Sequence, residues 1–113
     1  KVGATSIVVG HLGEAAVEQL RAACDSLRAR AGSAAVFLAA EHSGKVLLLA
    51  AMTADVAARG IKAGDLVRAI APIVGGKGGG KPDIAQGGGS ETAKIPDAVR
   101  EAGEWLSGKL GRG

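Results

Sequence analysis

The segment GGKGGGKPDIAQGGG, residues 75–89, guides the interpretation of the whole chain. Eight of its fifteen residues are glycine, and Lys77 and Lys81 lie among them, so we expect it to lie outside the core. Glycine has no Cβ and accepts positive φ, so the segment allows backbone N–H groups to approach a ligand closely. Backbone donors and lysine together suit phosphate oxygens, so we predict a loop that contacts a nucleic-acid backbone or a phosphorylated small molecule. A flexible linker is the alternative on composition, although the insert PDIAQ indicates resumed structure.

Length and composition predict one compact domain. The chain has 113 residues, which is enough for a buried core without a disulfide or a metal, so we expect residues 1–113 to form a single domain. Alanine accounts for 23 residues, and Phe37 and Trp105 are the only aromatic residues, so close backbone packing must replace bulky side chains. The net charge of +3 favours polyanions only modestly, and recognition should therefore be local.

The sequence also predicts a cytoplasmic location. A single cysteine, Cys24, cannot form an internal disulfide, and no apolar run reaches the roughly 18 residues that cross a bilayer. The chain begins at Lys1 without an initiator Met or a signal-like apolar segment, which predicts a fragment of a longer protein.

The first half of the chain predicts a strand, a helix and a hairpin. The β-branched run at residues 5–10 is typical of an interior strand that is buried on both faces. Apolar residues at helical spacing predict a helix over residues 12–31, with Cys24 on its buried face. Two apolar runs, residues 34–41 and 46–52, flank a Ser-Gly pair and predict a β-hairpin.

The second half predicts three helices around the glycine-rich segment. A short helix is expected over residues 53–59 and a second over 63–71, which Pro72 should end. A terminal amphipathic helix over residues 95–110 should carry Trp105 on its core face. This order predicts an α/β fold, with a mixed β-sheet flanked by α-helices and a Gly-rich loop before the C-terminal helix.

Enzymatic motifs do not fit the glycine-rich segment. Gly80 and Lys81 close the spacing of a P-loop, but Pro82 follows where a Ser or Thr must hold magnesium. The dinucleotide fingerprint fails at its last glycine. His11 and His42 have no ligand set nearby, and no carboxylate pair appears in a motif suited to acid–base chemistry. We therefore expect no catalytic residue, no metal and no cofactor.

The glycine-rich motif, together with the order of elements, resembles the C-terminal (C-Ala) domain of alanyl-tRNA synthetases, which is of the DHHA1 type. The matching positions are Gly78, Gly79, Gly80, Lys81, Pro82, Asp83, Ala85, Gln86, Gly88 and Gly89. Phosphoesterases that carry this domain after a DHH domain usually have His at the position of Lys81, which favours the synthetase branch. Pro72 departs from the family pattern and leaves the end of its helix open.

The resemblance implies a non-catalytic tRNA-binding module within an alanine–tRNA ligase. Such a module docks the tRNA elbow, where the D and T loops meet, and assists aminoacylation and editing. The implied RNA-binding residues are Lys77, Gly78, Gly79, Gly80, Lys81, Pro82, Asp83, Gln86, Gly88 and Gly89. The implied partners are the tRNA(Ala) elbow and the catalytic and editing domains of the parent chain, and some members also form a homodimer; no membrane partner is expected. The alternatives are a substrate-binding accessory domain of a DHH-family phosphoesterase and a dimerisation module.

Overall fold

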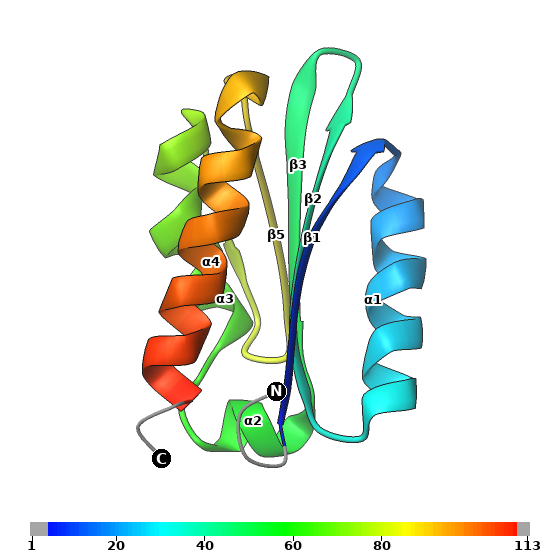
Figure 1. Ribbon diagram of the computed structural model, residues 1–113, viewed down its shortest axis with the longest axis vertical. Coiled ribbons are helices and arrows are strands. Elements are labelled where there is room, and N and C mark those ends of the chain that lie inside the picture. The colour runs from blue at the N-terminus through cyan, green and yellow to red at the C-terminus, as the bar shows by residue number, and fades with distance from the viewer. Residues whose placement is uncertain (1–4, 111–113) are drawn as a thin grey trace.

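A computed structural model describes residues 5–110 of the chain. A five-stranded sheet, ordered β1-β2-β3-β5-β4, has helices on both faces (Figure 1). Its strands are β1 (Ser6–Glu14), β2 (Ala34–His42), β3 (Lys45–Met52), β4 (Lys77–Gly80) and β5 (Ile84–Gly89). The helices are α1 (Val17–Ala31), α2 (Ala54–Ala58), α3 (Ala63–Ile70) and α4 (Ile95–Leu110), with 3₁₀ helices η1 (Ala71–Val74) and η2 (Thr92–Lys94). The predicted α/β class, a mixed sheet flanked by helices, is confirmed.

The predicted hairpin is formed by β2 and β3. Their antiparallel register runs from Ala35 opposite Met52 to His42 opposite Lys45. The two turn residues, Ser43 and Gly44, have φ values of 53° and 77°. Positive φ at both central positions matches the right-handed twist of the two strands, which explains why the Ser-Gly pair is a turn signal here.

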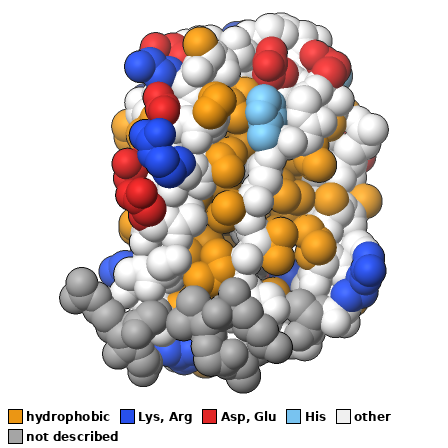
Figure 2. Space-filling view, viewed as in Figure 1, with side chains coloured by type: hydrophobic (Ala, Val, Ile, Leu, Met, Phe, Trp, Pro, Cys, Tyr) orange, Lys and Arg blue, Asp and Glu red, His pale blue; other side chains and the backbone are white. Residues whose placement is uncertain are grey.

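Strand β1 lies at an edge of the sheet, so the prediction of an interior strand is wrong. Its run is apolar because both of its faces are packed. Ile7 and Val9 contact the core below α3 and α4, and Val8 contacts the core below α1. Apolar side chains gather along the middle of the face shown in Figure 2, where β1 runs in front in Figure 1. An apolar run thus indicates that both faces of a strand are packed, but it does not show whether the strand lies at the edge or in the centre of the sheet.

Helix α1 begins at Val17, five residues after the predicted start at Leu12. Leu12 belongs to β1 and is 44% exposed. Gly13 has a φ of 72°, and Ala16 is extended, so the backbone becomes helical only at Val17. The side chain of Gln19 accepts a hydrogen bond of 2.7 Å from the backbone N–H of Ala16, which satisfies a donor that the helix leaves free.

The sheet separates two apolar layers. One layer lies below α3 and α4, and it includes Phe37 of β2 and Leu106 of α4. The other lies below α1, where Leu20 and Cys24 are fully buried, as predicted for Cys24. Trp105 is half-buried against the first layer, and the Lys109 ammonium lies 5.2 Å from its ring centroid.

The other predicted helices form near their expected positions, and α3 ends at Ile70. Pro72 lies in the first turn of η1, so the α-helix α3 does not continue and a 3₁₀ helix follows it. Of the helices within residues 5–110, none is both long enough and apolar enough to cross a bilayer.

The glycine-rich segment forms a β-hairpin, so the prediction of a loop is wrong. Strand β5 pairs with β3 from Ala51 opposite Ile84 to Val46 opposite Gly89, and β4 pairs with β5 on its outer side. Ala85 is buried in the first layer, which corrects the expectation that the segment lies outside the core. Glycine disfavours strands by itself, but β3 supplies backbone partners and α3 covers one face.

Helix α3 packs directly on the backbone of this hairpin. A Cβ added to Gly78 would lie 2.5 Å from Val67 Cγ1, and one added to Gly87 would lie 2.8 Å from the same atom. On the helix, a Cβ added to Gly64 would lie 2.7 Å from the carbonyl oxygen of Gly80. All three distances are below van der Waals contact, so these glycines allow the helix to approach the strands.

We expect Gly78→Ala to destabilise the chain by about 1–3 kcal/mol, because the new methyl group would clash with Val67 of α3 and with the backbone of Gly87 in β5. Urea denaturation measures this loss. Gly108→Ala is the matched control, since nothing lies within 4 Å of its added Cβ, and it should stabilise the chain by about 0.5 kcal/mol. Val67→Ala combined with Gly78→Ala should cost less than the sum of the two single changes. Equal stability of the two glycine variants would contradict the packing argument.

We expect Cys24 to be unreactive in the folded chain. Burial raises the pKa of its thiol to about 11 from an ordinary value of 9.0, which lowers the thiolate fraction at pH 8 about 100-fold. Iodoacetamide at pH 8 should therefore modify Cys24 only after unfolding in urea, as mass spectrometry would show. Equally fast modification with and without urea would show that the thiol is accessible.

Candidate nucleic-acid interface

The tip of the β4–β5 hairpin is fixed to the rest of the fold by backbone hydrogen bonds. The carbonyl of Pro82 accepts from Ala63 N–H at 2.9 Å, and the carbonyl of Lys81 accepts from Gly64 N–H at 3.2 Å. These donors lie at the start of α3, where a helix has no internal partners for them. The carbonyl of Asp83 accepts from Met52 N–H at 2.8 Å. The glycine-rich segment is therefore a fixed surface.

The outer edge of β4 is mostly glycine backbone, and Arg68 of α3 lies against it at Gly79, where an added Cβ would be 2.9 Å from its Nη1. Lys81 N–H donates a hydrogen bond of 2.9 Å to the carbonyl of Ile84, which shows which residue pairs of the β4–β5 hairpin are hydrogen-bonded pairs. Hydrogen-bonded pairs alternate along an antiparallel ladder. The backbone N–H and C=O groups of Lys77 and Gly79 therefore point toward β5, and those of Gly78 point away from it. Among the described strands none pairs on this side of β4. The outward N–H of Gly78 therefore has no partner among the described strands.

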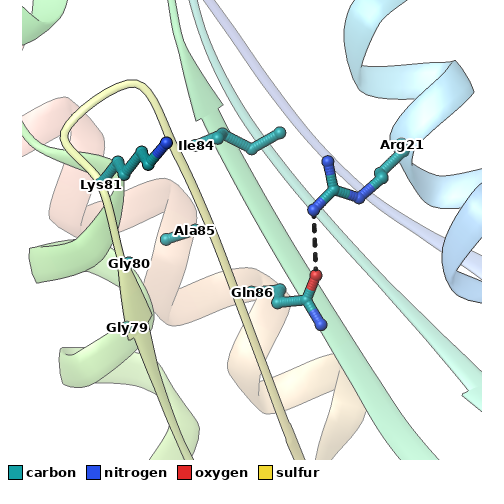
Figure 3. A pocket seen from close by; sticks show the side chains of 7 residues that line it. All are labelled: Arg21, Gly79, Gly80, Lys81, Ile84, Ala85 and Gln86. Atoms are coloured by element: carbon teal, nitrogen blue, oxygen red, sulfur yellow. Dashed lines mark hydrogen bonds between the residues drawn. The ribbon is translucent and has the colours of Figure 1, made fainter.

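A pocket of about 280 Å³ lies on the α1 side of the hairpin (Figure 3). It is lined by Arg21, Gly79, Gly80, Lys81, Ile84, Ala85 and Gln86. Arg21 extends from α1, and its Nη2 donates a hydrogen bond of 3.3 Å to Oε1 of Gln86. We call this the Arg21 pocket. It places two cationic side chains beside a glycine floor.

A second pocket, of about 340 Å³, lies on the α3 side of the hairpin. Its lining residues are Arg68, Pro72, Gly76, Lys77 and Gly78. Arg68 is partly neutralised by Asp65, whose carboxylate lies 2.9 Å from its Nη2. No salt bridge within residues 5–110 involves Arg21, Lys77 or Lys81. Three uncompensated cations therefore border the hairpin, on its two sides.

The predicted site residues separate into three groups. Gly79, Gly80, Lys81 and Gln86 line the Arg21 pocket, and Lys77 and Gly78 line the second pocket. Pro82 and Asp83 lie in the exposed turn, where their carbonyls hold the hairpin in place. Gly88 and Gly89 line neither pocket. Added Cβ atoms at these two positions would clash with the carbonyl oxygens of Val46 and Val74. Their smallness serves strand and helix packing.

Sequence reasoning missed Arg21 and Arg68 as site residues. Both lie on polar faces of predicted helices, where the pattern indicates only exposure to solvent. Arg21 is 65 positions from Gln86, and only the packing of α1 on the sheet brings the two together. The available signal was a basic residue on a helix face, which is too common to identify a site.

The DHHA1 domain family matches residues 4–108 of the chain. Alanine–tRNA ligase of Cupriavidus necator is 47% identical over 104 residues, which are 92% of this chain and 12% of that protein. Alanine–tRNA ligase of Paraburkholderia phytofirmans is 44% identical over 110 residues, which are 97% of this chain and again 12% of the relative. The chain thus spans about an eighth of the length of these relatives.

Two solved structures share the fold. A DHH-domain protein, described as a member of a family of ribosomal proteins, has a TM-score of 0.51 at 19% identity, over 77% of this chain and 20% of that one, which shows the fold alone. The crystal structure of the C-Ala domain from Aquifex aeolicus alanyl-tRNA synthetase has a TM-score of 0.81 at 30% identity, over 98% of this chain and 96% of that one. The chain therefore belongs to the DHHA1 domain family, as a domain of the C-Ala type found in alanyl-tRNA synthetase.

Proposed function

We propose that the chain is the tRNA-binding module of an alanine–tRNA ligase and that its β4–β5 hairpin contacts the elbow of tRNA(Ala). One observation carries the proposal. The hairpin presents the glycine backbone of β4, which lacks a strand partner on its outer side, between Lys77 and the Arg21 pocket. Backbone N–H groups and lysine ammonium groups together bind phosphate and ribose oxygens, which are the groups that a folded RNA exposes.

Recognition by shape also agrees with the few aromatic residues. Proteins that read single-stranded RNA usually stack its bases on aromatic side chains. Here Phe37 is fully buried, and Trp105 is half-buried below Lys109 and distant in sequence from the hairpin. A glycine edge can instead lie against riboses at a compact RNA corner. The RNA-binding residues that we propose are those of the hairpin, namely Lys77 to Asp83 and Gln86. Gly88 and Gly89 are proposed to act indirectly, through the packing of the hairpin.

The module itself is proposed to be non-catalytic. Residues 1–113 would act as one domain, without metal or cofactor, and bring tRNA to the catalytic and editing domains of a cytoplasmic parent chain. The accessory-domain alternative has less support, because Lys81 stands where the related phosphoesterases usually carry His. The 19% identity to a DHH-domain protein supports only a common fold.

We expect the double variant Lys77→Ala, Lys81→Ala to bind tRNA(Ala) about tenfold more weakly than the wild type. Two lost phosphate contacts should also reduce the slope of log affinity against log salt by about two. Filter binding measures both quantities, using transcripts with an intact elbow and transcripts whose D-loop/T-loop contact is disrupted. The wild type should prefer the intact elbow.

The matched control is the double variant Arg30→Ala, Lys45→Ala, which removes the same charge. Both residues are exposed, and neither lines a pocket beside the hairpin. It should retain the preference and most of the affinity. Equal loss in both double variants, or equal binding of both transcripts by the wild type, would leave only nonspecific charge attraction and reject the proposal.

A further inference from the structure

The side chains that line the Arg21 pocket are rich in hydrogen-bond donors. Arg21 has five N–H groups, Lys81 has three and the amide of Gln86 has two. The only side-chain acceptor is Oε1 of Gln86, and Arg21 already donates to it. No carboxylate lines the pocket. A ligand that satisfies this lining must itself supply acceptors and negative charge, which describes an oxyanion.

The hydrogen bond from Arg21 to Gln86 orients the guanidinium over the pocket. It uses one of the five donors, and Arg21 makes no other side-chain hydrogen bond within residues 5–110. In Figure 3, Arg21 and Lys81 enter the pocket from opposite sides, with Ile84 between them. A planar guanidinium held at one end presents its remaining N–H groups as a fork that fits two oxygens of one phosphate.

The shape of the pocket also favours a phosphate group attached to something larger. Its volume of about 280 Å³ is open on one side, and Gly79 and Gly80 contribute no side chains to its wall. Ile84, which packs against the layer below α1, supplies an apolar surface next to the cations. A ribose could lie on this surface while its phosphate contacts Arg21 and Lys81.

We propose that the Arg21 pocket is a phosphate-binding site, with Arg21 as its principal ligand and Gln86 as the residue that positions Arg21. If the proposed function holds, the phosphate belongs to a phosphodiester of the bound RNA, and this choice of ligand rests on that proposal. The site would then extend the interface from the glycine hairpin to α1. A free phosphate compound has the same chemistry and is the other source to be tested.

The first experiment compares tRNA(Ala) binding by single variants of the full chain. Arg21→Ala should weaken binding about fivefold and reduce the salt slope by about one. Gln86→Glu should cause a similar loss although Arg21 is retained, because the new carboxylate would pair with the guanidinium. Arg30→Ala is the control on the same helix: nine residues at 3.6 per turn place Arg30 about 180° from Arg21, and binding should change less than twofold.

The second experiment needs no RNA. The side-chain amide of Gln86 is followed by NMR while inorganic phosphate is added, with sodium chloride at matched ionic strength as the reference. A saturable shift is expected in the wild type and in Arg30→Ala, and it should disappear in Arg21→Ala. The dispersion of the amide spectrum reports folding of each variant at the same time.

The two experiments separate the proposals. Specific losses in Arg21→Ala and Gln86→Glu with tRNA would support the site with RNA as the source. If the wild type fails to bind tRNA but the phosphate shift depends on Arg21, the site stands with a free phosphate compound as ligand, and the proposed function fails. If phosphate leaves Gln86 unshifted and Arg21→Ala matches Arg30→Ala with tRNA, the phosphate site is overturned.

Discussion

The close contact between α3 and the β4–β5 hairpin is the constraint on which the site depends. Val67 packs on backbone at Gly78 and Gly87, where any larger residue would separate helix and sheet. In return, the turn of the hairpin supplies acceptors for the first N–H groups of α3. A strand made of glycine has little tendency to form by itself, so its order comes from this packing and from pairing with β3. Helix and hairpin therefore stabilise each other.

This constraint also determines which surfaces stay open. Because α3 covers much of one face of the hairpin, a ligand can reach the outer edge of β4, the pocket beside Arg68 and the side toward α1. Helix α1 packs over β2 and β3 and leaves the hairpin beside it uncovered, and Arg21 bridges the space between them. The backbone groups of the hairpin are thus held before any ligand arrives, and Arg21 is oriented by its hydrogen bond to Gln86, which reduces the ordering cost of binding. A flexible glycine loop would lose that advantage.

Sequence reasoning succeeded where a local signal controls the structure. The Ser43-Gly44 turn, the apolar face of α3 and its end before Pro72 all follow from turn chemistry, periodicity or the missing N–H of proline. It failed where tertiary contacts override local tendency, as in the strands of the glycine segment and the late start of α1. Of the candidate site, the cluster around Lys81 was predictable from composition, and Arg21 was not, since its partner lies 65 positions away.

The small number of uncompensated cations at the hairpin bears on how a module of this kind would work. Three such cations and a few backbone donors would give a modest and salt-sensitive attraction to RNA. Under the proposed function this is sufficient, because the relatives are about eight times longer than the chain, and a tethered module adds its contacts to those of the other domains at high effective concentration. A weak contact also releases quickly. Geometry, fixed by α3 and the glycines, would then supply the preference for a folded corner, which charge alone cannot give.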